Sequence, residues 1–326
     1  MIFDRLDNEL QNQFFKCAKT LLSKDKFLII THYRPDGDTL GSALALCSAL
    51  QSFGKTAYIL KNPDTQEKFI DYISFYEAPP EYIPNTVITV DIADISLLTD
   101  NAKPYSQHID FVIDHHPENR VHSKNKLCLE QFAAAGEIVY LLINAMDCEI
   151  DEDIAAGIYI AISTDTGCFK YSNTSWVTHA IAAEVMEYGV DITFLNKILF
   201  ETKSRGRFAL EQQAISNLEF YADGRIAIMT ITNEMKQSSA VKDDETEDLS
   251  AIPRTIEGVE VAVTITESKD GNTKVSVRTV EEFDAAELCK AFDGGGHARA
   301  AGCLIKKSVE LSKPQIIEQA LKFYDN

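Results

Sequence analysis

Short apolar runs alternate with helical patterns along the first two thirds of the chain. Runs of four or five residues that are apolar throughout are typical of strands buried on both faces of a parallel sheet. Between them, apolar residues recur every three or four positions, which is the period of a helix. We therefore expect an α/β sheet covered by helices on both faces. Strands are predicted at 26–30, 56–60, 86–90 and 109–113, and helices at 7–23, 41–53, 136–146, 153–163 and 175–188.

The pattern changes near residue 220, where strand-like runs follow one another at 225–231, 259–266 and 273–280. The turn formers of 267–272 predict a hairpin between the last two runs. Together with a length of 326 residues, this indicates two domains. We expect a doubly wound parallel-sheet domain at 1–195, a helical connector at 196–218, and a smaller C-terminal α/β domain at 219–326.

Composition limits the classes of partner. The chain carries 31 Lys and Arg against 50 Asp and Glu, a net charge of -19, and such a surface repels duplex nucleic acid and anionic membranes. The acidic run at 242–248 is interpreted as a solvated loop or helix start.

Seven scattered cysteines without C-x-x-C spacing indicate free thiols. With neither a signal peptide nor a membrane-spanning run in the sequence, we expect a cytoplasmic protein.

Titratable residues follow the first predicted strand. His32, Asp36 and Asp38 lie in a turn-forming segment directly after it. Open α/β sheets place their ligands at the carboxyl ends of strands. One imidazole and two carboxylates there can hold a divalent cation. The alternative is a turn that is rich in Asp because Asp favours turns.

Three more clusters follow later elements. Asp91 comes directly after a predicted strand and could equally be a helix cap. Asp114, His115 and His116 end another strand, and packing alone explains three consecutive titratable residues poorly. Asp165 ends a helical pattern, where a carboxylate is unfavourable unless positive charge lies nearby. A metal ion would supply that charge.

The clusters together provide enough ligands for two cations that share a carboxylate, and two such ions can activate a bridging water for phosphoryl displacement. Imidazole ligands favour Mn²⁺, or Fe²⁺ or Co²⁺, over Mg²⁺. A single Zn²⁺ site is the weaker option because the set is rich in carboxylates. The candidate ligands are His32, Asp36, Asp38, Asp91, His115 and Asp165.

A glycine-rich run near the C-terminus predicts a phosphate site. Gly295 and Gly296 lie ahead of an apparent helical pattern, where backbone N–H groups and the helix N-terminus attract anions. His297 and Arg299 add donors, and Arg278 could clamp a phosphate. A flexible loop and a solvent-facing strand residue are the alternative interpretations.

These motifs resemble those of the DHH phosphoesterase superfamily, whose members carry a DHH domain followed by a DHHA1 domain. The metal-ligand motifs match in order, and the Gly-Gly-Gly-His run matches the C-terminal signature, so the resemblance covers nearly the whole chain. Within the superfamily, the chain looks most like the nanoRNase/pAp phosphatase (NrnA-type) branch, on the residues of 114–119 and 164–174.

The resemblance implies a role for each candidate residue. Asp91 would bridge the two metals, His116 would face the scissile phosphate, and Asp114 would orient the histidines. His297 and Arg278 would reach the substrate from the second domain, with the active site in the interdomain cleft. One metal would be held by His32, Asp36 and Asp91, and the other by Asp38, Asp91, His115 and Asp165.

The function expected from this resemblance is a Mn²⁺-dependent phosphoesterase that works by attack of a metal-bridging hydroxide. Its substrates would be short oligonucleotides, linear dinucleotides or 3′-phosphoadenosine 5′-phosphate. A cyclic dinucleotide phosphodiesterase and a catalytically inactive nucleotide-binding regulator are the alternatives. The acidic surface then limits the length of nucleic acid that is bound rather than excluding it. The sequence leaves open the preferred substrate, the cleavage polarity, the native metal and whether a homodimer forms.

Overall fold

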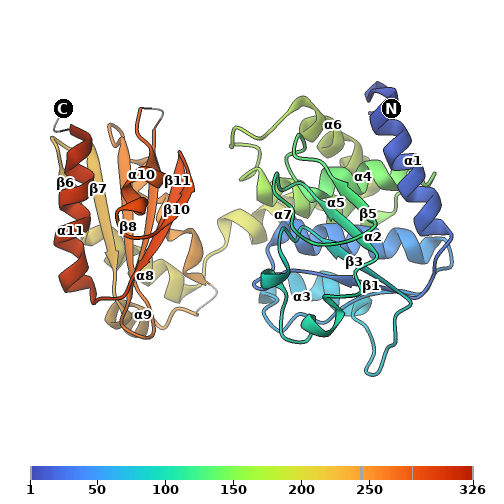
Figure 1. The fold of residues 1–326 in the computed structure, drawn as a ribbon, viewed down its shortest axis with the longest axis horizontal. Coiled ribbons are helices and arrows are strands. Elements are labelled where there is room, and N and C mark those ends of the chain that lie inside the picture. The colour runs from blue at the N-terminus through green and yellow to red at the C-terminus, as the bar shows by residue number, and fades with distance from the viewer. Residues whose placement is uncertain (1, 243–244, 281, 325–326) are drawn as a thin grey trace. The chain divides into compact units, whose positions relative to one another are not determined.

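The chain divides into two compact units, Met1–Thr202 and Lys203–Asn326, which are described one at a time (Figure 1). The computed structural model describes residues 2–242, 245–280 and 282–324. The predicted acidic loop at 242–248 therefore lies partly outside the described residues, and a 3-10 helix, Glu247–Ala251, begins within it. None of the seven cysteines, all of which are described, forms a disulfide.

The first unit is built on a parallel sheet, which confirms the α/β prediction. Its strand order is β2-β1-β3-β4-β5, the order of a doubly wound sheet whose direction of winding reverses between β1 and β3. Four strands match the predicted apolar runs, whereas the edge strand β5 was not predicted. The strands are β1 (Phe27–Ile30), β2 (Ala57–Ile59), β3 (Thr86–Val90), β4 (Phe111–Asp114) and β5 (Asn125–Cys128).

Two hydrophobic layers bury this sheet. One face packs against helices and forms the main core, because alternate strand residues such as Ile29 and Ile88 point into it. The other face, with Ile30 and Val112, is covered by loops and the 3-10 turns Ile95–Leu97 and Lys103–Tyr105, so the expectation that helices cover both faces is wrong for this face. The helices are α1 (Asn8–Leu22), α2 (Gly37–Ser52), α3 (Glu67–Ile73), α4 (Ala135–Ala145), α5 (Glu152–Asp165), α6 (Trp176–Val185) and α7 (Ile192–Asn196).

Helices α2 and α5 pack with their backbones in close contact. A Cβ atom added to Gly41 would lie 2.3 Å from the carbonyl oxygen of Gly157, and one added to Gly37 would lie 2.4 Å from the Thr164 side chain. Only glycine permits such an approach. The contact brings the first turn of α2, which carries Asp38, against the last turn of α5, which carries Asp165.

The second unit is a six-stranded mixed sheet in the order β10-β11-β9-β8-β7-β6, in which only β7 and β8 pair in parallel. Two helices cover one face of the sheet and two others cover part of the opposite face. The helices are α10 (Ala285–Lys290) and α11 (Val309–Leu321) on the first face, and α8 (Arg205–Ser216) and α9 (Asn233–Ser239) on the second. The strands are β6 (Glu219–Tyr221), β7 (Ile226–Ile231), β8 (Val261–Glu267), β9 (Thr273–Thr279), β10 (Gly295–His297) and β11 (Ala300–Ile305).

The segment predicted as a connector is helical. It contains a short π-helix, Lys197–Glu201, and then α8. Leu210 and Ala214 of α8 are buried against Met229 of β7, so α8 belongs to the second core. Within the described part of the chain, every helix is too short or too polar to cross a bilayer.

The expectation that a helix follows the glycine run is wrong. The run forms β10, which pairs with β11 as a hairpin. In β11, Ala301, Cys303 and Ile305 are buried while the residues between them are more exposed, so the burial period is two rather than 3.6. Gly296 has φ +143° and lies so close to the partner strand that an added Cβ would meet the Ala300 oxygen at 2.6 Å. The glycines therefore shape a tight hairpin and not a helix N-terminus.

Candidate metal centre

The predicted ligands of the first unit converge at the carboxyl ends of β1, β3 and β4. His32 lies just past β1, Asp91 directly follows β3, and Asp114 is the last residue of β4. Because the winding reverses between β1 and β3, a crevice is expected at this point of the sheet edge. Three overlapping groups of His and Asp side chains there have ligand atoms within 4.8 Å of one another.

The first group contains His32, Asp36 and Asp91. His32 Nε2 lies 3.6 Å from an oxygen of each carboxylate. His32 Nδ1 lies 2.8 Å from the Tyr33 carbonyl, which can only accept, so Nδ1 donates and Nε2 faces the carboxylates. Burial disfavours a charged imidazole, but Asp36 and Asp91 outweigh it and raise the pKa of His32 to about 11. In the protein without bound metal, protonated His32 therefore supplies positive charge beside Asp36 and Asp91.

The other two groups, Asp38–His115–Asp165 and Asp91–His115–His116, are centred on His115. Its Nε2 lies 3.7 Å from Asp38 Oδ2, 3.5 Å from Asp91 Oδ1 and 3.6 Å from Asp165 Oδ2. Its Nδ1 lies 3.3 Å from the Phe132 carbonyl, which fixes the ring in the same way as His32. A backbone acceptor behind each imidazole is the usual support of a metal-binding histidine.

Asp91 lies between His32 and His115: its Oδ2 faces His32 and its Oδ1 faces His115. It is buried and its backbone is left-handed, with φ +57°, a strained conformation for a residue other than glycine. It caps no helix, so the alternative interpretation is wrong. Its Oδ1 has no hydrogen-bond partner among the described residues. A buried carboxylate oxygen without a donor, facing imidazole nitrogens, fits a cation ligand.

Negative charge accumulates in this centre. Burial raises the pKa of Asp91 to about 6 and that of Asp165 to about 7, and the charge of Asp36 adds to both shifts. Burial, together with the charges of Asp91 and Asp165, also holds the pKa of Asp38 well above its usual range. Divalent cations would reverse these shifts because they offset the repulsion between the carboxylates. Four carboxylates and two imidazoles are thus a suitable donor set for two such ions.

The predicted catalytic pair is held by a hydrogen-bond network. Asp114 is completely buried, and its Oδ1 accepts from His116 Nδ1 at 2.8 Å and from the backbone N–H of His115 at 2.9 Å. Its Oδ2 accepts from Asn119 Nδ2 at 2.6 Å. The bond to Asp114 is the main reason that the pKa of His116 is raised to about 9. His116 is therefore protonated at neutral pH in the metal-free protein, with Nε2 left to contact a ligand.

The groups that hold Asp38 were not predicted. Its Oδ2 accepts from the backbone N–H of Ala135 at 2.7 Å, and its Oδ1 from that of Gly136 at 2.9 Å and from Ser42 Oγ at 3.1 Å. The N-terminus of α4 thus fixes this carboxylate. Beside it, buried Glu137 accepts from Ala133 N–H and from the Thr178 hydroxyl. Backbone donors leave no residue signature, although the predicted start of a helix at 136 was the available clue.

The predicted phosphate ligands lie in the second unit. His297 and Arg278 both stand opposite Ala300, on the two strands that flank β11, so their side chains share one face of the sheet. An added Cβ at Gly295 would meet nothing within 4 Å, so its backbone is open to a ligand. The guanidinium of Arg299 donates to the carbonyl oxygens of residues 280 and 283, which commits part of it to the loop.

Comparison with known proteins agrees with both halves of the chain. The family model of the DHH family, N-terminal domain, matches residues 26–162, and that of the DHHA1 domain matches residues 224–326. The chain is 30% identical over 280 residues to the bifunctional oligoribonuclease and PAP phosphatase NrnA of Thermus thermophilus, covering 85% of this chain and 83% of that protein. It is 24% identical to the protein of the same name from Bacillus subtilis, covering 88% and 91%.

Solved structures share the fold. An exopolyphosphatase-related protein from Bacteroides fragilis is similar with a TM-score of 0.82 at 24% identity, covering 96% of each chain. Exonuclease RecJ bound to manganese is similar with a TM-score of 0.53 at 13% identity, covering 94% of this chain and 92% of that one. The resemblance read from the motifs is confirmed, and the chain belongs to the DHH family of phosphoesterases, with an N-terminal DHH domain and a C-terminal DHHA1 domain.

Proposed function

We propose that this phosphoesterase hydrolyses short oligoribonucleotides, linear dinucleotides and 3′-phosphoadenosine 5′-phosphate with the help of two divalent ions. The observation that carries the proposal is the sharing of Asp91 between two ligand groups at one sheet edge. The NrnA relatives support the substrate class. The mixture of imidazole and carboxylate ligands favours Mn²⁺ over Mg²⁺.

His32, Asp36 and Asp91 would hold one ion. The other would be held by Asp38, Asp91, His115 and Asp165. When bound, two such ions supply an activated water as nucleophile and neutralise charge on the phosphate oxygens.

The chain's own residues position the substrate and its protons. Asp114 fixes the His116 ring through Nδ1, which leaves Nε2 to donate to a phosphate oxygen or to the leaving group. In the DHHA1 domain, His297, Arg278 and the open backbone at Gly295 would bind a second phosphate or the chain end. A net charge of -19 disfavours long nucleic acid, which needs an extended basic track.

A substrate panel at saturating Mn²⁺ tests the proposal. Turnover should be fastest with linear dinucleotides, very short RNA or 3′-phosphoadenosine 5′-phosphate, and slow with long RNA. Asp91→Asn should abolish it, whereas Asp94→Asn, which alters a nearby carboxylate that caps the 3-10 turn Ile95–Leu97, should leave it unchanged. Exclusive hydrolysis of cyclic dinucleotides or pyrophosphate would contradict the proposal, and so would nucleotide binding without turnover.

A further inference from the structure

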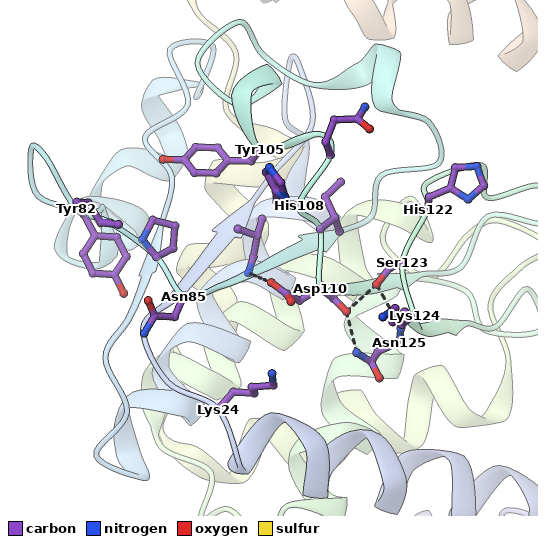
Figure 2. A pocket seen from close by; sticks show the side chains of 15 residues that line it. Lys24, Tyr82, Asn85, Tyr105, His108, Asp110, His122, Ser123, Lys124 and Asn125 are labelled. Carbon is purple, nitrogen blue, oxygen red and sulfur yellow. Dashed lines mark hydrogen bonds between the residues drawn. The ribbon is translucent and has the colours of Figure 1, made fainter.

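A pocket of about 1030 Å³, here called the amino-edge pocket, opens where β3, β4 and β5 begin (Figure 2). It is lined by residues of 82–87, 105–110 and 122–125, together with Lys24. The candidate metal centre lies at the opposite ends of β3 and β4. A strand of four or five residues spans about 15 Å, so the two features are separated by roughly that distance. The pocket is large enough for a drug-sized ligand.

Two lysines and two histidines gather around the pocket in an otherwise acidic protein. Lys24, Lys124, His108 and His122 all line it. None of these four side chains has a hydrogen-bond or ion-pair partner within the described ranges 2–242, 245–280 and 282–324. A chain with a net charge of -19 offers many carboxylates that could have paired with them. The two lysine charges on one concave surface therefore attract anions locally, and the histidine ring nitrogens add hydrogen-bonding groups.

Among the described residues that line the pocket, Asp110 is the one acidic side chain, and the two lysines outnumber it. Asp110 Oδ2 accepts from the backbone N–H of Val87 at 2.9 Å. The carbonyl of Asp110 accepts from Ser123 Oγ at 2.6 Å and from Asn125 Nδ2 at 3.0 Å. Figure 2 shows these bonds tying together the starts of neighbouring strands. These hydrogen bonds hold the floor of the pocket in shape without a ligand.

The opposite side of the pocket is aromatic. In Figure 2, Tyr82 and Tyr105 lie to the left of His122 and Lys124. The Tyr82 ring packs edge-on against Tyr58 with centroids 4.9 Å apart, and its buried hydroxyl has no partner among the described residues. Aromatic rings stack on nucleobases, and the half-buried Tyr105 ring lines the pocket.

We propose that the amino-edge pocket is a second ligand site that binds a nucleoside monophosphate. Its phosphate would contact Lys24 and Lys124, and its base would lie against Tyr105. This site needs no metal and no turnover, so it goes beyond the proposed function and can fail independently of it.

The test is calorimetric titration of adenosine 5′-monophosphate into the full-length protein in the presence of a chelator. Lys24→Gln combined with Lys124→Gln should weaken binding about tenfold or more, as expected for the loss of charge-assisted bonds. Lys16→Gln combined with Lys19→Gln makes the same charge change on exposed residues of α1 outside the pocket, and should leave binding unchanged. Mn²⁺-dependent turnover of a linear dinucleotide, measured without added adenosine 5′-monophosphate, should be the same in the wild-type protein and in both double variants.

Adenosine and inorganic phosphate serve as partial ligands. Both should bind more weakly than the monophosphate, and Tyr105→Ala should weaken the monophosphate but not phosphate. The proposal is overturned if the monophosphate fails to bind, or if the pocket lysines do not affect its binding. Equal affinity for phosphate alone would overturn the nucleotide assignment. If the wild-type protein shows no turnover of the substrate panel, the proposed function is contradicted. The result for monophosphate binding is not affected by that outcome.

Discussion

Replacing Asp114 with Asn changes the charge behind His116 and nearly preserves the shape of the side chain. In the wild-type protein the carboxylate is completely buried and its Oδ1 lies 2.8 Å from His116 Nδ1. Burial raises the pKa of Asp114, but the bonds from His116 and Asn119 outweigh it and lower that pKa below its usual range. The carboxylate is therefore ionised at neutral pH, and Asp114→Asn removes a full negative charge next to the imidazole.

The size of the effect follows from this contact. The bond to Asp114 is the largest cause that raises the pKa of His116 to about 9, and Asp91 and Asp165 add smaller contributions. An opposite charge at this distance shifts a pKa by about 1 to 3 units. Asp114→Asn should therefore lower the pKa of His116 by about 1 to 2 units, because the two other carboxylates remain. Mutation of a residue that orients a metal-site side chain in this way typically lowers activity or metal affinity by about 10- to 100-fold.

NMR titration of the His116 ring in metal-free protein measures the shift directly. His116 should then lose its proton at lower pH, and the Mn²⁺-dependent kcat should fall most strongly on the alkaline side. Asp25→Asn is the matched control, since Asp25 accepts two backbone N–H bonds where β1 and β2 begin, at the end of β1 opposite to the candidate metal ligands. An unchanged His116 titration with wild-type kcat would refute the assignment of Asp114 as its orienting partner.

Three further predictions concern the hairpin, the metal ligands and the helix contact. Gly296→Ala should lower the thermal stability of the second unit because of φ +143° and the contact of 2.6 Å, whereas Gly295→Ala should preserve stability and raise KM. Mn²⁺ affinity, measured by calorimetry, should rise with pH through the neutral range and above it, because binding must release protons from Asp91 (pKa about 6), Asp165 (pKa about 7) and His32 (pKa about 11). Gly41→Ala should destabilise the first unit by about 1–3 kcal/mol in denaturant unfolding, because its methyl group would meet a carbonyl oxygen at 2.3 Å.

Each of these predictions has a result that would contradict it. Equal melting temperatures for the two hairpin variants would show that Gly296 is not conformationally required. A Mn²⁺ affinity that is constant or falls between pH 5 and 8 would mean that the carboxylates do not bind as ligands in their ionised form. A wild-type unfolding midpoint for Gly41→Ala would show that α2 and α5 can separate without cost.

The first four strands could be predicted because almost every residue in them is buried and most are apolar. Strand β5 reads Asn-Lys-Leu-Cys and lies at the sheet edge, where only Leu127 is fully buried, so its apolar signal is too weak. Helix α2 begins at Gly37 rather than at the predicted residue 41, because the Asp36 carboxylate accepts from two N–H groups of its first turn. A residue predicted only as a metal ligand thus also caps a helix.

The clustering of the candidate ligands could be predicted because several of them follow strands that could be recognised, as His32, Asp91 and His115 do. The left-handed backbone of Asp91 and the amide clamp on Asp38 were not, since both depend on how distant segments pack. The hairpin of β10 and β11 was missed for a related reason. Small residues such as Ala300 and Ala301 fit a helix as well as a strand until the alternating burial of β11 is known.

Turnover of a linear dinucleotide as Mn²⁺ is added stepwise to metal-free protein tests the central claim most directly. If two ions share Asp91, activity should reach its plateau only after the second equivalent, and Asp91→Asn should stay inactive throughout. Full activity at one equivalent, or activity that persists in a chelator, would contradict the account.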